Sequence, residues 1–140
     1  ASDAIIPGAG SASGITLALA AACAGKAVAI SRRHDADNAV LADLQAQLAD
    51  LVKSALALAQ ADALQFKRHL TNESPATGDA LLRTDQRILD VCRKLDTLLD
   101  DNIHLIAENM AGDWQAAREL SHASRVIQEG NVQELKDAAI

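Results

Sequence analysis

The chain has 140 residues, the size of a single domain, and aromatic residues make up only 1% of it, so its core must be aliphatic. The formal net charge of -6 argues against a basic face for a phosphate backbone, and the lack of aromatics argues against a base-stacking platform. We therefore expect one domain over residues 1–140 that does not bind nucleic acid.

The first element is a helix of small residues, mostly alanine, that runs from Ile15 to Ile30. It is apolar on all sides, and a helix of that kind must be covered by protein or lipid all round. Lys26 interrupts it well short of a spanning length, and no basic residue precedes it, so we expect neither a membrane span nor a signal peptide. We predict a central helix that the others surround.

A glycine-punctuated turn from Pro7 to Ser11 leads into this helix. Gly8 and Gly10 can adopt positive φ or let a ligand approach the backbone closely. Ser11 or Ser13 can cap the first amides of the helix. A turn with free amides at a helix N-terminus is suited to binding an anion.

A second helix is predicted from Ala39 to about Thr71, with Asp37 or Asn38 as its cap. Its apolar stripe consists of Leu41, Leu44, Leu48, Leu51, Ala55, Leu58, Phe66 and Leu70. Asp62 falls on that stripe, where a carboxylate is costly unless it is paired or used. Two interpretations stay open: a functional carboxylate, or an aspartate at the edge of the stripe that reaches solvent or an arginine.

A loop follows over residues 72–78, and a third helix is predicted from about Asp79, with a restart near Thr84 or Asp85. Its stripe consists of Ile88, Cys92, Leu95, Leu99, Ile103 and Ile106. The two cysteines, Cys23 and Cys92, lie at helical positions among apolar neighbours, which favours buried free thiols in a reducing, cytoplasmic compartment.

After a break at Gly112, Asp113 is placed to cap a fourth helix. The stripe predicted for that helix consists of Trp114, Ala117, Leu120, Ala123 and Ile127. Gly130 is expected to end it, and a short helix follows from Val132. No segment has a strand pattern, so we predict an all-α bundle of about five helices around the alanine-rich one.

Chemical motifs are few. The four histidines show no spacing that brings two onto one helical face, so no metal site is expected. Ser11 and Ser13 follow no strand, which excludes a nucleophile elbow. What remains is the glycine turn and two carboxylates, Asp62 and Asp113.

These residues carry a resemblance to the cyclodeaminase/cyclohydrolase family. The opening from Pro7 to Ala12, PGAGSA, and the alanine-rich helix after it resemble the family's PGGGS/A motif and first helix. The run from Asp62 to Phe66, DALQF, resembles its D-x-x-A-F. In the same order, Gly112-Asp113 resembles its S-D and Asn131-Val132 its N-V.

The resemblance implies an all-α, usually dimeric protein that binds a reduced folate as substrate. It would hydrolyse 5,10-methenyltetrahydrofolate, or cyclise 5-formiminotetrahydrofolate with loss of ammonia. Asp62 and Asp113 would be the acid–base and charge-stabilising residues. Substrate-binding positions would be Gly8, Gly10, Ser11 and Asn131, with Arg32 and Arg33 meeting a glutamate tail.

The sequence departs from the family pattern at several positions. The middle glycine of the turn is Ala9, and a second asparagine after N-V is replaced by Leu135. Arg32 and Arg33 stand where the family has a lysine-rich segment, and a guanidinium does not replace a positioned ammonium one for one. A non-folate or catalytically inactive relative, acting as a small-molecule-binding or assembly protein, is the alternative hypothesis.

Assembly is the last expectation. A chain this short has few helices with which to cover its apolar first helix, so we predict a homodimer with a largely apolar interface.

Overall fold

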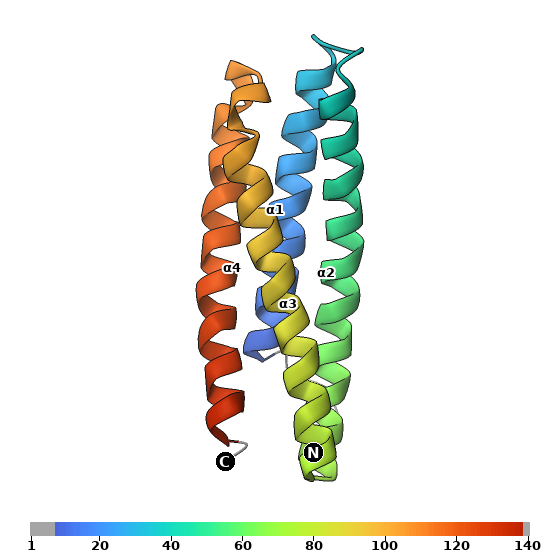
Figure 1. Cartoon of the computed structure of the whole chain (residues 1–140), viewed down its shortest axis with the longest axis vertical. Coiled ribbons are helices and arrows are strands. Elements are labelled where there is room, and N and C mark those ends of the chain that lie inside the picture. Colours follow the sequence, from blue (N-terminus) through green and yellow to red (C-terminus); the bar gives the residue numbers. More distant parts are fainter. Residues whose placement is uncertain (1–7, 139–140) are drawn as a thin grey trace, which may run out of the picture.

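The computed structural model describes residues 8–138, which form four long α-helices packed in an up-down-up-down bundle (Figure 1). The helices are α1 (Ala9–Arg32), α2 (Ala39–Thr71), α3 (Pro75–Asp101) and α4 (Ala111–Ala138). Two 3₁₀ turns, η1 (Ile103–Leu105) and η2 (Glu108–Met110), connect α3 to α4. No strand occurs in this part of the chain, and the all-α prediction is confirmed.

Helix α1 is one of four helices and not a central one. It packs mainly on α2 and α4 and lies diagonally opposite α3. Ile15 and Leu19 on its outer face are 51% and 54% exposed. Because the residues of α1 are almost all small or apolar, the sequence could not show which face would be left uncovered. By length and composition α1 could cross a membrane, but half of its most apolar window is buried within the bundle.

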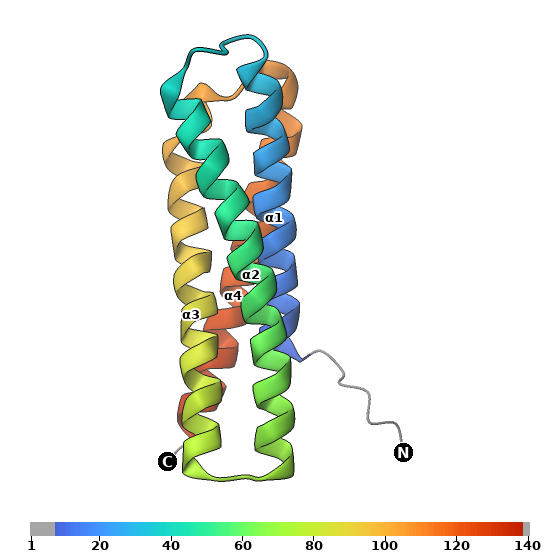
Figure 2. The same cartoon turned by 90° about the vertical axis from the view of Figure 1, so that its right-hand side faces the viewer.

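Helix α1 begins part way along the bundle, so α2 and α3 extend beyond its first turn (Figure 2). This explains why the predicted stripe of α2 fails near its end, where Phe66 and Leu70 are exposed. The buried face of α2 instead continues from Ala55 through Ala59 to Asp62.

The cap predicted for α2 is confirmed. The Asn38 side chain accepts hydrogen bonds from the amides of Val40 and Leu41 at the start of α2. Helix α3 begins four residues earlier than predicted, because Ser74 and Thr77 form a reciprocal capping box just before and within its first turn.

Helix α4 differs most from the prediction. It runs through Gly130 without a break, so the chain has four long helices and no separate short one after Val132. A helical glycine costs about 0.5–1 kcal/mol relative to alanine, and burial of Gln128 and Val132 on either side offsets that cost. The predicted stripe is also wrong beyond Leu120: Leu120 is half-buried against the core, but Ala123 and Ile127 are exposed. The buried residues of α4 are Trp114, Ala117, Ser121, Ser124, Gln128 and Val132.

The glycine turn is also shorter than predicted. Helix α1 starts at Ala9 with Gly8 as an extended N-cap, so Gly10 and Ser11 lie inside the helix, and no glycine in residues 8–138 has positive φ. No side chain caps the first amides of α1, so neither Ser11 nor Ser13 has the predicted capping role. Pro7 lies outside the described residues.

Candidate functional site

A pair of buried carboxyl groups lies beneath the first turn of α1. Asp62 of α2 is 4% exposed and Asp85 of α3 is 1% exposed, and the two side chains are hydrogen-bonded to each other. Their Oδ1 atoms both lie in the space that a Cβ on Gly10 would occupy. Because Gly10 has no side chain, the backbone of α1 rests directly on the pair.

Ser11 adds a hydroxyl contact from α1. Its Oγ lies 3.1 Å from Asp62 Oδ2 and 3.1 Å from the carbonyl oxygen of Ala59, both of which can accept its proton. Asp62 therefore lies directly against Gly10 and Ser11, two residues of the predicted glycine turn. The side chain of Ser11 faces α2 and is buried, so it binds the carboxyl group and does not line the outside of the turn.

Helix α4 contributes two amide side chains. Gln128 Nε2 donates to the Oδ1 and the main-chain oxygen of Asp85, both at 2.8 Å. Its Oε1 accepts a hydrogen bond of 2.6 Å from Ser13 Oγ, which fixes the orientation of the amide. Asn131, one turn further along α4, also acts on Asp85: its amide lowers the pKa of that carboxyl group, though less than Gln128 does. The predicted site residue Asn131 thus belongs to this cluster, together with Asp62, Gly10 and Ser11.

Burial raises the pKa of Asp85 to about 8, and the hydrogen bond to Asp62 adds to the shift. The amides of Gln128 and Asn131 act in the opposite direction by stabilising the charged form. No salt bridge reaches either aspartate within residues 8–138. With no cation to balance them, two ionised carboxyl groups in contact would repel each other, which is a further reason for the raised pKa of Asp85.

The polar cluster continues along the core of the bundle. Ser124 Oγ donates to the main-chain oxygen of Ser13 at 2.7 Å and lies 3.3 Å from Cys92 Sγ. Burial raises the pKa of the Cys92 thiol, which keeps it protonated and weakly nucleophilic. The serines on the buried face of α4 therefore bind polar groups of α1 and α3.

Asp113 does not join the cluster. It lies in the first turn of α4 as its third residue and not as its N-cap, and its Oδ1 accepts a hydrogen bond of 3.2 Å from Lys26 Nζ. The sixteen residues from Gly10 to Lys26 span about 24 Å of helix. Asp113 and Asp62 are thus too far apart in one chain to act on the same atom of a substrate.

Arg32 and Arg33 lie still further away, at the last turn of α1. The 22 residues from Gly10 to Arg32 span about 33 Å. Arg32 Nη1 donates to Gln45 Oε1 at 2.7 Å, while Arg33 is exposed. Within one chain these arginines do not lie beside the carboxyl pair.

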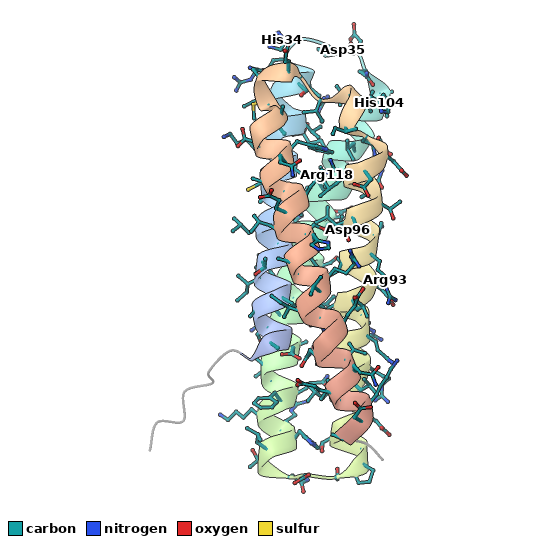
Figure 3. The ribbon with its side chains drawn as sticks, turned by 90° about the vertical axis from the view of Figure 1, so that its left-hand side faces the viewer. His34, Asp35, Arg93, Asp96, His104 and Arg118 are labelled. Carbon is teal, nitrogen blue, oxygen red and sulfur yellow. The ribbon has the colours of Figure 1, made fainter. Side chains whose placement is uncertain are left out.

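A second polar region lies in a groove of about 410 Å³ between α3 and α4. Figure 3 shows Asp96 and Arg118 along this face. Its guanidinium groups are already paired: Arg118 with Asp100, and Arg125 with Asp96 and Glu129. The positive charges of the two arginines in this groove are therefore already neutralised by carboxylates of the same chain.

Sequence reasoning missed Asp85 and Gln128. Asp85 carried the same signal as Asp62, because it lies at helical spacing between Leu81 and Ile88 on the buried face of α3. Gln128 carries no such signal, because the spacing of apolar residues in α4 predicts a different buried face from the one observed. No group of three or more metal-ligating side chains is found in the described part of the chain.

No family model and no curated protein sequence matches the chain. Among solved structures, it is similar to formiminotetrahydrofolate cyclodeaminase from Thermotoga maritima, with a TM-score of 0.88 and 17% sequence identity. The match covers 98% of this chain and 74% of that one. At this identity the likeness shows a shared fold, the fold expected from the glycine turn, Asp62 and Asn131.

Proposed function

We propose that this chain is a folate one-carbon enzyme that hydrolyses 5,10-methenyltetrahydrofolate or cyclises 5-formiminotetrahydrofolate with loss of ammonia. The observation that carries the proposal is the position of Asp62, whose carboxyl group lies against the backbone of Gly10 and beside a second carboxyl group. The fold shared with a formiminotetrahydrofolate cyclodeaminase supports the choice of substrate.

Asp62 suits either reaction. The reacting carbon is part of a cationic amidine, which a carboxylate can stabilise by charge. The same carboxylate can take a proton from attacking water, or from a ring nitrogen, and return one to the leaving group. The uncapped amides of α1 belong to the same first turn that rests on the carboxyl pair, and they are suited to an anionic part of the ligand.

Access to Asp62 requires movement, because only 4% of this residue is exposed. Gly8, the N-cap of α1, is exposed and has no atom within 4 Å of the place where a Cβ would stand. We infer that a substrate enters by displacing the first turn of α1. Its amides are the least constrained of the helix, since its end carries no side-chain cap.

The alternative function is that of a small-molecule-binding or assembly protein without turnover. It is favoured by the closed hydrogen-bond cluster around Asp62 and by the distance of Asp113, Arg32 and Arg33 from it. In that case the buried polar groups would serve to fix the register of the helices.

A homodimer is the assembly that we propose. Exposed apolar side chains occur on two helices that pack directly together: Ile15 and Leu19 on α1, and Val126 and Ile127 on α4. A second copy of the chain would remove these groups from water. Cys23 and Cys92 are both free, which supports a reducing, cytoplasmic location.

Calorimetric titration with tetrahydrofolate, followed by turnover assays with the methenyl and formimino derivatives, tests the function. Loss of the methenyl group to water would identify the hydrolase, and release of ammonia the cyclodeaminase. Binding without either reaction would favour the alternative, and no interaction with any reduced folate would refute the folate proposal.

A further inference from the structure

The carboxyl pair has a feature that the proposed function does not use, namely that Asp62 and Asp85 occupy different environments. Asp62 Oδ2 lies within hydrogen-bond distance of a serine hydroxyl, and its Oδ1 lies under Gly10. Asp85 is bound on its Oδ1 by the amide of Gln128 and is the more buried of the two. The pair is therefore asymmetric, with one member held more tightly by the core.

We propose that Asp62 and Asp85 share one proton and act as a single acid–base unit. Asp62 would face the substrate, and Asp85, oriented by Gln128, would be a positioning residue that holds the proton. This inference rests on the proposed function for its substrate, but the sharing of the proton is a property of the ligand-free protein.

The groups that surround the pair explain why the two carboxyl groups together hold one proton, and not two or none. Asp62 belongs to α2 and Asp85 to α3. The groups of α1 and α4 that contact them are uncharged, namely the backbone of Gly10, a hydroxyl group and side-chain amides. Among the groups acting on Asp85 in the described residues, Asp62 is the one that titrates. Two adjacent anions in such a site would repel, and two neutral acids would leave no base.

Gln128 determines where the proton resides. Its Nε2 lies 2.8 Å from the main-chain oxygen of Asp85, which can only accept, so Nε2 is the amide atom that points at Asp85 and donates to Oδ1. That oxygen is thereby fixed as an acceptor. The proton of the pair then lies on Asp62, from which it can be donated to Asp85, or on the other oxygen of Asp85.

In the hydrolytic direction, the oxygen of water forms a bond to the amidinium carbon and the O–H bond breaks, its proton passing to Asp62. One C–N bond of the tetrahedral carbon then breaks, and the leaving ring nitrogen takes that proton. The remaining hydroxyl proton is released to solvent as the formyl C=O forms. The proton held with Asp85 lets Asp62 alternate between acceptor and donor without two charges meeting in the core.

The test is kinetic and uses variants that preserve shape. Asp85→Asn keeps a donor toward Asp62 but cannot release a proton. We expect kcat to fall about 10- to 100-fold with little change in KM, and the alkaline limb of the pH profile near pH 8 to disappear. Wild-type kcat and an unchanged pH profile in Asp85→Asn would overturn the inference.

Gln128→Met tests the positioning role, because methionine fills the space of glutamine without its donor. We expect a lower kcat, an unchanged KM and a displaced alkaline limb. Gln133→Met is the matched control, since Gln133 is exposed on the same helix and binds Asp137. Equal pH profiles for the two variants would count against any role of Gln128.

A measurement without substrate separates this inference from the proposed function. In protein carrying ¹³C-labelled aspartate carboxyl groups, we expect one carboxyl resonance to titrate near pH 8, to be absent from Asp85→Asn, to titrate at lower pH in Asp62→Asn and to be unchanged in Asp113→Asn. If wild-type protein turns over no folate, the proposed function fails, while this titration still confirms the shared proton. If all aspartates titrate below pH 5, the shared proton is refuted whatever the activity.

Discussion

Gly10 of α1 and Asp62 of α2 are in direct contact. A Cβ placed on Gly10 would overlap Asp62 Oδ1 and Asp85 Oδ1, and would lie 2.6 Å from Asp62 Cγ. The contact requires glycine for space and not for backbone conformation, because Gly10 lies inside the helix without positive φ.

We therefore expect Gly10→Ala to lower the free energy of unfolding by about 1–3 kcal/mol, the usual cost of overpacking a core. The carboxyl groups that it would strike are buried and hydrogen-bonded, so they cannot move away cheaply. Gly8→Ala is the matched control, because nothing lies within 4 Å of its Cβ position. Urea unfolding measures both, and equal stabilities for the two variants would contradict the described contact.

Gly14 provides a second test of the α1–α2 interface. A Cβ there would lie 2.8 Å from Ala59 Cβ, 3.2 Å from Ala59 Cα and 3.3 Å from the main-chain oxygen of Ala55. Backbone atoms cannot rotate aside, so Gly14→Ala should separate the helices and lower the thermal midpoint. Gly25→Ala meets no atom within 4 Å and should raise stability by about 0.5–1 kcal/mol. A stabilising Gly14→Ala would show that α1 packs less closely than described.

Stability should depend on pH through Asp85. Its pKa is about 8 in the folded protein against 3.8 for an ordinary aspartate, so between these values the folded state binds more protons than the unfolded state. This contribution is fully present below pH 3.8 and is lost as pH rises toward 8. The slope approaches about 1.4 kcal/mol per pH unit for one proton.

Asp85→Asn should flatten that slope, because asparagine does not titrate. Urea unfolding at several pH values between 5 and 8 measures the effect, with Asp113→Asn as the control. A wild-type stability that rises over this range, with no difference in Asp85→Asn, would show that Asp85 is ionised in the folded protein.

The two aspartates first predicted to be catalytic should now behave differently. Asp62→Asn removes the proposed acid–base group, and we expect turnover of a methenyl- or formiminofolate to fall by at least about 100-fold with the helical circular dichroism unchanged. Asp113 pairs with Lys26 on the surface, so Asp113→Asn should cost at most about 1 kcal/mol of stability and little activity. Full activity of Asp62→Asn would remove the proposed mechanism.

The proposed dimer predicts a specific surface. Leu19→Lys places a charge on the exposed face of α1, and light scattering should then show the mass of one chain where wild type shows that of two. Leu70→Lys is the control, because Leu70 is also exposed but lies about two helical turns beyond Asp62, the residue of α2 that contacts the first turn of α1. A wild-type protein that is monomeric at micromolar concentration would refute the dimer.

The sequence alone was sufficient for the all-α class, for the limits of α2 and for four members of the buried cluster, Gly10, Ser11, Asp62 and Asn131. Those predictions depended on local chemistry: caps such as Asn38, the helical period of long aliphatic residues, and a short motif around Asp62. Asp85 could have been found by the same periodicity, since it lies on the stripe of α3 as Asp62 lies on that of α2.

Only the tertiary structure decided the rest. In α4, serine and glutamine face the core while Val126 and Ile127 face outward, because Ser124 and Gln128 bind polar groups of neighbouring helices. Hydrophobic periodicity cannot show such a face, since its burial is stabilised by partners far away in the sequence. For the same reason, only the packing of α1 on α2 and α4 could separate Asp113 from Asp62, and only the packing of α2 on α3 could join Asp62 to Asp85.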